Sequence, residues 1–233
     1  LQVPHPPGAP LFVILGRLFI VLFGAGNPAK AINIMSALSS GFTILFLFWT
    51  ITHFAKKLVG KGLSELNSQQ TFAVMSAGVV GALAYTFSDS FWFSAVEGEV
   101  YALSSLFTAL VFWAILKWEH NADKPGADKW IVFIFFMMGL SIGVHLLNLL
   151  TIPAIVMVYY FKRYQPTPWG TFWAFIIGCL ITGFVQVAVI QWTVKLAGWF
   201  DIRFVNGFGL PFFSGFIFFF VLLAVLLWFG LKI

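Results

Sequence analysis

The sequence predicts an all-α membrane protein, a polytopic bundle of about seven transmembrane helices preceded by an interfacial helix. Apolar residues make up 61% of the 233 positions and charged residues only 9%, which is too little charge to solvate a globule of this size. Aromatic residues, which gather at membrane interfaces, reach 19%, and the apolar residues occur in successive long runs. Lipid is therefore the expected solvent for most side chains, and no segment is predicted to form a soluble domain.

The first apolar run, Leu11 to Gly24, is too short to cross a bilayer. It has about 14 residues and contains Arg17, whereas a crossing takes roughly 20 residues. We expect an interfacial helix that begins at Pro10 and lies along the membrane. The first crossing is expected at Ala31 to Phe54, and the Ala-Lys-Lys sequence after it places that end in the cytoplasm by the positive-inside rule.

The next elements are expected to alternate across the membrane. Thr71 to Phe87 goes out, and the polar and aromatic stretch Ser88 to Glu99 lies at the outer face. Val100 to Lys117 returns, and Trp118 to Lys129 is a charged cytoplasmic loop with a Pro-Gly turn.

A broken pair of short helices is expected next. About 32 mostly apolar residues precede the basic pair Lys162-Arg163, too many for one helix and too few for two full crossings. The break is expected at Gly139 to Asn148, where glycine, serine, histidine and asparagine interrupt the apolar run. Because polar groups at membrane depth persist only when they are buried in protein or line a wet cavity, His145 and Asn148 are candidates for the wall of an outward-facing cavity.

The last part of the chain completes the alternation. Thr171 to Val194 is expected to go out, Lys195 to Gly209 to form an outer loop, and Pro211 to Gly230 to return. Nine of the 13 Lys and Arg residues then fall inside and four outside. The whole chain is predicted to be one transmembrane domain, with 1–30 as outer loop and interfacial helix and 31–233 as the helical bundle.

The polar residues outside the cytoplasmic loops gather at the outer face, so any chemistry is expected there. Loop polarity is ordinary by itself, but Glu97 and Glu99 stand among aromatic residues where a helix begins. Two neighbouring carboxylates in an apolar setting repel, so one of them can hold a proton as a general acid or base must. A helix-capping role for one of them is an equal alternative.

Three further side chains are candidates for ligand contacts. His5 lies in a stiff stretch with four prolines, which is either a ligand-contact loop or a connector. His145 is costly near membrane depth unless it is paired or functional. Arg203, in the expected outer loop, either binds a phosphate as a bidentate partner or anchors the interface.

Several function classes have no support in the sequence. There is no HExxH, no CxxC and no Walker-type loop, so neither zinc hydrolysis nor P-loop nucleotide hydrolysis is indicated. The basic residues sit in short loops between apolar runs, so the net charge of +5 indicates orientation and not nucleic-acid binding. The single cysteine, Cys179, lies in an apolar run and is expected to pack as a small hydrophobic residue.

The chain resembles the DUF2723 family of bacterial membrane proteins. The segments that carry the resemblance are His5-Pro-Pro-Gly-Ala-Pro-Leu-Phe12, Ala95-Val-Glu-Gly-Glu-Val-Tyr-Ala-Leu103 and Gly139-Leu-Ser-Ile-Gly-Val-His145. The resemblance extends over essentially the whole chain, and the His-Pro-Pro-Gly segment is its most specific part. That family is similar to the protein O-mannosyltransferases and belongs with the GT-C glycosyltransferases.

The resemblance implies a membrane glycosyltransferase. Such an enzyme moves a sugar from a polyprenyl-phosphate donor to an acceptor, expected to be a Ser or Thr hydroxyl of an exported protein, at the periplasmic face of the bacterial inner membrane. The family pattern places the catalytic acid upstream of Leu1, so the chain is expected to be an internal piece of a longer protein. Within the chain Glu99 is the candidate. No metal ligand is predicted, and a requirement for a divalent metal stays open.

The physical needs of that reaction assign roles to the candidates. A lipid-linked donor needs a hydrogen-bonding or basic site for its phosphate, and the acceptor hydroxyl needs a base. The predicted phosphate contacts are His145, Asn148 and Arg203; Glu97 and Glu99 line the acceptor or sugar pocket, and His5 borders the donor. A transporter is one alternative, because an intramembrane histidine and a glycine-broken helix pair also suit a substrate pathway. A non-catalytic membrane assembly subunit is the other.

Overall fold

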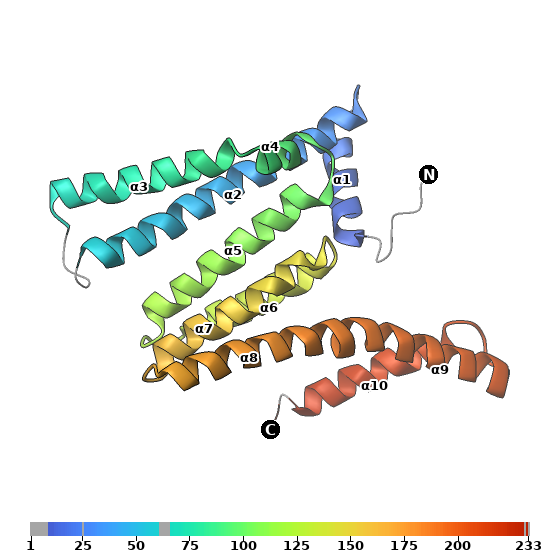
Figure 1. Ribbon diagram of the computed structural model, residues 1–233. Coiled ribbons are helices and arrows are strands. Elements are labelled where there is room, and N and C mark those ends of the chain that lie inside the picture. Colours follow the sequence, from blue (N-terminus) through green and yellow to red (C-terminus); the bar gives the residue numbers. More distant parts are fainter. Residues whose placement is uncertain (1–8, 25, 61–65, 231, 233) are drawn as a thin grey trace. The chain divides into compact units, whose positions relative to one another are not determined.

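The computed structural model describes residues 9–24, 26–60, 66–230 and 232, and every regular element among them is a helix (Figure 1). In chain order these are α1 (Pro10–Phe23), α2 (Pro28–Val59), α3 (Ser68–Thr86), α4 (Asp89–Val96), α5 (Val100–Asn121), α6 (Lys129–Ile142), the 3-10 helix η1 (Leu146–Thr151), α7 (Ile152–Arg163), α8 (Pro168–Phe184), the π-helix η2 (Val185–Trp192), α9 (Thr193–Phe208) and α10 (Ser214–Gly230). The prediction of an all-α protein is confirmed.

Four helices of the described residues are long and apolar enough to cross a membrane, and five if the bent pair of α3 and α4 counts as one. They are α2, α5, the continuous η1 and α7, and the continuous run from α8 to α9. The sequence predicted about seven crossings. The two remaining expected crossings are also helices, but α6 has only 14 residues and α10 only 17.

The described residues divide into two compact units, 1–178 and 179–233, which are described separately. We refer to them as unit 1 and unit 2. A single transmembrane domain over the whole chain stays a prediction.

In unit 1, α2 packs along both α3 and α5 (Figure 1). The approach to α3 is close at Gly78, where a Cβ atom would lie 2.5 Å from Cγ2 of Thr52. On the faces of α2 and α5 that are buried, small polar side chains such as Ser36, Ser40 and Ser104 alternate with apolar ones. Small residues let helix backbones approach closely, which is how membrane helices associate without a hydrophobic driving force.

The helices of unit 1 alternate in direction, so their polar ends gather at two places (Figure 1). The end that holds Lys56, Lys57, Lys117 and Lys162 is called the lysine end. The opposite end holds α4, the start of α5 and the break between α6 and α7, and is called the α4 end. An alternation of helix direction was predicted, and which end faces the cytoplasm stays a prediction.

The break between α6 and α7 lies where the sequence predicted it. Helix α6 ends at Ile142, and His145 is extended, with φ −161° and ψ 146°, before η1 begins. Because η1 continues directly into α7, the break consists of one short turn followed by a single 3-10 helix. The chain therefore forms two helices separated by a break, as expected, and their outward and inward direction across the membrane stays a prediction.

Helix α1 begins at Pro10, as predicted, and Figure 1 shows it running across the α4 end. One of its faces packs into unit 1 through Leu11, Phe12 and Leu15. The other face exposes large apolar side chains, which include Val13, Ile14, Val21 and Leu22. This distribution suits a helix whose outer face meets lipid, and its position along the membrane stays a prediction.

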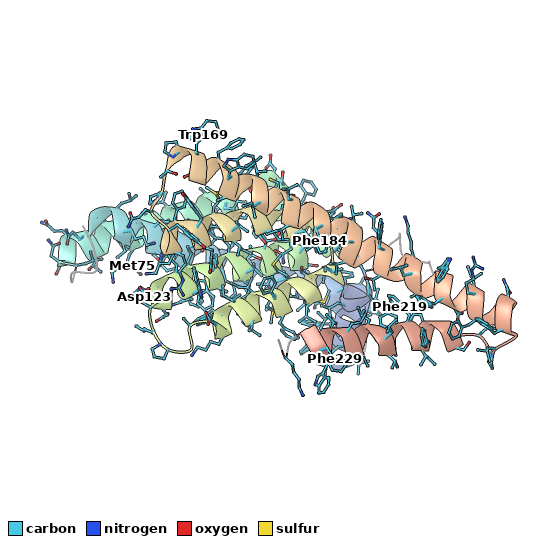
Figure 2. The ribbon with its side chains drawn as sticks, turned by 90° about the horizontal axis from the view of Figure 1, so that it is seen from below. Met75, Asp123, Trp169, Phe184, Phe219 and Phe229 are labelled. Atoms are coloured by element: carbon cyan, nitrogen blue, oxygen red, sulfur yellow. The ribbon has the colours of Figure 1, made fainter. Side chains whose placement is uncertain are left out.

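In unit 2, α9 and α10 form a hairpin (Figure 2). Phe219 lies on the side of α10 that faces α9, whereas Phe229 points away (Figure 2). Gly209, with φ 65°, ends α9 in the left-handed conformation that favours glycine. The carboxylate of Asp201 accepts hydrogen bonds from the backbone N–H groups of Phe213 and Gly215, so it caps the start of α10.

The predicted outer loop Lys195 to Gly209 is wrong, because these residues form most of α9. The polar side chains in this stretch suggested a loop. However, Phe200, Phe204 and Phe208 recur every four residues, so they lie on one face of a helix. The rings of Phe200 and Phe204 contact α10, and this packing outweighs the polarity of the opposite face.

Candidate functional site

The α4 end brings together the described parts of the three segments that carry the family resemblance. Leu103 and Phe107 of α5 pack with Val144 of the break, and Leu11 of α1 packs against them. The backbone N–H of Leu11 also donates to the carbonyl oxygen of Gly143 at 2.7 Å. Three segments that are far apart in the sequence therefore meet in one cluster.

Gly143 allows a close approach of the two backbones at this meeting point. A Cβ atom there would lie 3.0 Å from Cβ of Leu11 and 3.3 Å from the carbonyl oxygen of Leu140. The start of α1 is thus held directly against the break. His5 lies outside the described residues, so its contacts stay a prediction.

The side chain of His145 has a defined orientation. Its Nδ1 accepts a hydrogen bond from the backbone N–H of Leu147 at 3.1 Å, which caps η1. A neutral imidazole that accepts through Nδ1 carries its proton on Nε2. The ring lies 5.5 Å from the ring of Tyr101, two residues after Glu99. His145 therefore offers a hydrogen-bond donor, Nε2–H, beside the start of α5.

Asn148 is fully buried, with 0% of its surface exposed. Its side-chain amide nitrogen donates to Oγ of Ser141 at 2.9 Å, and the hydroxyl of Thr151 donates to its backbone carbonyl oxygen at 2.6 Å. The first bond ties η1 to α6, and the second lies within η1. The amide is therefore turned into the protein and is not open to a ligand in this structure.

Glu97 and Glu99 are exposed and flank Gly98, which packs on α2. A Cβ atom at Gly98 would lie 2.9 Å from Cγ2 of Ile32, so the backbone between the two carboxylates is held close to α2. Glu99 precedes α5, yet its side chain makes no capping hydrogen bond. Within the described residues neither carboxylate forms an ion pair. Both remain available to a ligand.

A cavity of about 520 Å³ lies between α4 and the start of α2. Its polar lining is Asn27, Lys30 and Asn33, none of which the sequence analysis singled out. Asn33 lies beside the Glu97–Glu99 segment, since its Oδ1 would be 3.4 Å from a Cβ atom at Gly98. The sequence could have indicated this cavity through Asn27, Lys30 and Asn33, which stand close together at the start of the first expected crossing.

Arg203 lies in α9 of unit 2. Its guanidinium carbon is 5.3 Å from the ring centroid of Trp199, a distance suited to a cation–π contact. Phosphate binding and interface anchoring by Arg203 both stay predictions.

Among the residues that the structure describes, no three His, Cys, Asp or Glu side chains cluster closely enough to hold a metal ion.

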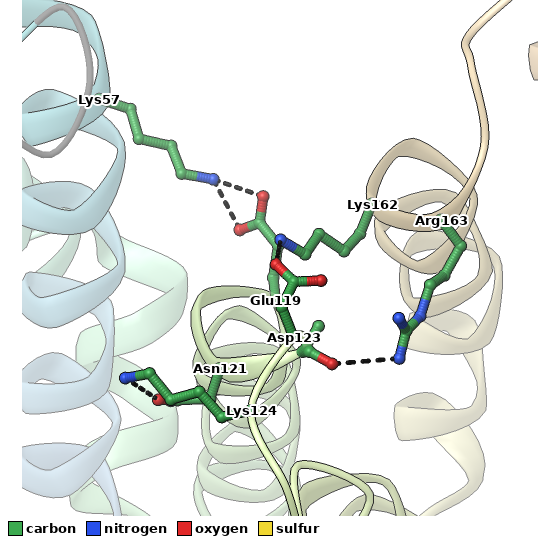
Figure 3. A network of polar contacts seen from close by, with 8 residues as sticks. Lys57, Glu119, Asn121, Asp123, Lys124, Lys162 and Arg163 are labelled. Atoms are coloured by element: carbon green, nitrogen blue, oxygen red, sulfur yellow. Dashed lines mark hydrogen bonds and ion pairs between the residues drawn. The ribbon is translucent and has the colours of Figure 1, made fainter.

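At the lysine end, unlike at the α4 end, two carboxylates form ion pairs with lysines (Figure 3). Nζ of Lys57 lies 2.5 Å and 2.6 Å from the two carboxylate oxygens of Glu119, and Nζ of Lys162 lies 2.6 Å from Oδ2 of Asp123. The hydrogen bond from Lys162, followed by its positive charge, lowers the pKa of Asp123 below its ordinary value. Glu119 and Asp123 are therefore each paired with a lysine.

Comparison with known proteins places the chain in a family. The profile described as Protein O-mannosyl-transferase TMEM260 N-terminal domain matches residues 1–168. The chain is 28% identical over 142 residues to Protein O-mannosyl-transferase TMEM260 of Mus musculus, an alignment that covers 61% of this chain and 18% of that protein. It is 27% identical over 111 residues to Protein O-mannosyl-transferase tmem260 of Dictyostelium discoideum, covering 47% of this chain and 12% of that protein.

The chain thus spans less than a fifth of the length of these curated relatives. No solved structure matches it. The family match covers all of the α4 end, including the three segments that meet there. With its long apolar helices this chain is a multi-pass membrane protein, and it belongs to the family of the Protein O-mannosyl-transferase TMEM260 N-terminal domain.

Proposed function

We propose that this chain is the membrane-embedded part of a glycosyltransferase that moves mannose from a polyprenyl-phosphate carrier to a Ser or Thr hydroxyl of an exported protein. The observation that carries this proposal is the meeting of three segments at the α4 end of a chain that belongs to this family. The curated relatives are named as protein O-mannosyl-transferases, which supports the sugar and the protein acceptor.

The proposed reaction is a single displacement. The acceptor oxygen forms a bond to the anomeric carbon of the sugar, and the bond between that carbon and the carrier phosphate oxygen breaks. A carboxylate takes the hydroxyl proton, and the polyprenyl phosphate leaves with the bonding electron pair. The site must therefore supply a base on one side of the sugar and hydrogen-bond donors for the leaving phosphate on the other.

The α4 end offers both kinds of group. Glu99 is the candidate base within this chain, and Glu97 is proposed to line the acceptor or sugar pocket. The Nε2–H of His145 suits a phosphate oxygen, because it is a donor held in place by the cap on η1. Asn148 is proposed to position the break that carries His145, since its amide is occupied inside the protein.

We further propose that the α4 end faces the periplasm of a bacterial inner membrane. The distribution of lysines supports this orientation, because basic residues mark the cytoplasmic side of a membrane protein. Arg203 and His5 are retained as proposed contacts of the phosphate and the donor. The carrier would enter from the outer leaflet.

The experiment is a transfer assay on the whole protein in lipid vesicles. A synthetic polyprenyl-phosphate mannose is the donor, and a Ser/Thr-rich peptide is the acceptor. Glu99→Gln is expected to lower kcat at least about 100-fold with little change in KM for the donor, because a positioned base contributes on this scale. Asp89→Asn, which changes another exposed carboxylate of the same end, is the matched control and is expected to retain activity.

Equal activity of Glu99→Gln and the native protein would remove Glu99 from the reaction. If the native protein transfers no sugar from this donor but does so from a nucleotide sugar, the proposed donor is wrong.

A further inference from the structure

The lysine end contains two cavities that share part of their lining. One, of about 490 Å³, lies between α2, α3 and α5, and the other, of about 460 Å³, lies between α2, α5 and α7. His53, Lys56, Leu116 and Lys117 line both of them. The two cavities together are called the lysine-end pocket. It lies at the end opposite the Glu99 and His145 segments and plays no part in the proposed reaction.

The pocket has a surplus of positive charge. Among the described residues, four lysines line it, Lys56, Lys57, Lys117 and Lys162, against the two carboxylates of Glu119 and Asp123. Both carboxylates are already paired, one with Lys57 and one with Lys162 (Figure 3). Within the described residues Lys56 and Lys117 have no ion-pair partner, and Lys117 only lies over the ring of Trp113, 5.2 Å from its centroid.

The rest of the lining is graded from polar to apolar. The two unpaired lysines lie toward the ends of α2 and α5, whereas Trp49 of α2 and Val74 and Met75 of α3 form an apolar part of the lining. Thr52 and Thr71 also line this cavity. A ligand that fills this space therefore needs a charged head with a hydrogen-bonding oxygen and an apolar tail.

Aromatic residues favour a membrane interface as the location of the pocket. Trp49 and Trp113 line it with their rings 5.5 Å apart, and the ring of Trp130 lies 5.7 Å from that of Trp113. Tryptophan rings concentrate at the headgroup level of a bilayer, and basic pockets between transmembrane helices on the cytoplasmic side suit anionic headgroups.

We propose that the lysine-end pocket binds one anionic phospholipid of the adjacent leaflet. Lys56 and Lys117 contact its phosphate, and an acyl chain lies along Trp49, Val74 and Met75. The charge surplus excludes a zwitterionic lipid as the preferred occupant, because only a ligand with net negative charge neutralises the two unpaired lysines. The lipid joins α2, α3 and α5 at the end where their contacts open into cavities.

The test is native mass spectrometry of the whole protein after incubation with phosphatidylglycerol or phosphatidylcholine. The native protein is expected to retain phosphatidylglycerol in preference to phosphatidylcholine. The double variant Lys56→Gln/Lys117→Gln is expected to weaken this retention about 25-fold, because each basic residue near a membrane surface contributes about fivefold. Lys124→Gln/Lys129→Gln removes the same charge from the same end without touching the pocket and is expected to retain the lipid.

Two further measurements complete the test, one with an arginine variant and one with inorganic phosphate as a competitor. Lys56→Arg/Lys117→Arg keeps the charge and is expected to retain the lipid, so it separates lost binding from lost folding. Inorganic phosphate is expected not to displace phosphatidylglycerol, since it lacks the tail. Equal loss in both glutamine variants, equal retention of the two lipids, or displacement by inorganic phosphate would each overturn the proposal.

Discussion

At the lysine end, Glu119 and Asp123 each accept a hydrogen bond from a lysine, whereas at the α4 end Glu97 and Glu99 have no ion-pair partner among the described residues. The α4 end instead fixes its backbone, through the bond from Leu11 to Gly143 and the cap that His145 provides. The lysine end thus pairs Glu119 and Asp123 with lysines, whereas the α4 end leaves Glu97 and Glu99 unpaired and holds the backbone near them in place.

This difference separates two uses of polar residues in a membrane protein. Paired charges at the lysine end help to set orientation and join helix ends, and exposed pairs add little stability because water screens them. Glu97 and Glu99 at the α4 end form no ion pair within the described residues, which leaves them free to take the roles proposed above. The buried hydrogen bonds of Asn148 support that end from within.

The largest expected effect comes from separating the two functions of His145. His145→Asn keeps a side-chain acceptor that can cap η1 but removes the donor at the Nε2 position, whereas His145→Gln keeps a donor at that reach. We expect His145→Asn to lower sugar transfer about 100-fold, as loss of one transition-state donor does, and His145→Gln to retain most of it. The measurement is kcat in the vesicle assay.

If both variants are equally inactive while folded, His145 acts as a base or through its ring, and the donor role is wrong. Their thermal unfolding, followed by tryptophan fluorescence, shows whether each variant keeps its fold.

A smaller effect is expected at Asn148. Asn148→Ala leaves Ser141 without the hydrogen bond that it accepts and opens a small void in the break, so we expect a loss of about 2 kcal/mol in unfolding free energy. Asn33→Ala, at an exposed asparagine of the same end, is the control and is expected to change stability by less than about 0.5 kcal/mol. The measurement is equilibrium unfolding in detergent. Similar losses in the two variants would contradict the supporting role of Asn148.

The smallest effect is expected at the lysine end, from Asp123. Its pKa in the folded protein is lowered from 3.8, chiefly by the hydrogen bond from Lys162. The stability that this pair contributes is therefore present above pH 3.8 and is lost as the pH falls through the lower, folded pKa. Thermal unfolding of the native protein and Asp123→Asn is expected to differ slightly at neutral pH and to coincide in strong acid. A difference that grows on acidification would contradict the pairing.

Several parts of the fold could be predicted because they depend on neighbouring residues. The start of α1 at Pro10 and the break after Ile142 follow from a proline at one place and from clustered glycine and polar residues at the other. The outer loop at Lys195 to Gly209 could not be predicted correctly, because the polarity of Asp201 and Arg203 concealed a helix that packing stabilises. Asp201 was taken as a loop residue and in fact caps α10.

The candidate site could also be predicted only in part. The sequence indicated Glu97, Glu99 and His145 as polar residues at one membrane face, but it gave no information on their partners. The burial of Asn148 and the cavity beside Asn33 became apparent only in the folded chain.

By itself, the amino-acid sequence determined the membrane class and the positions of most helices, because the length of an apolar run acts locally along the chain. Only the tertiary structure decided that Leu11 meets Gly143 and that Tyr101 meets His145. Contacts between distant segments depend on how helix surfaces fit together, and no local pattern encodes that fit.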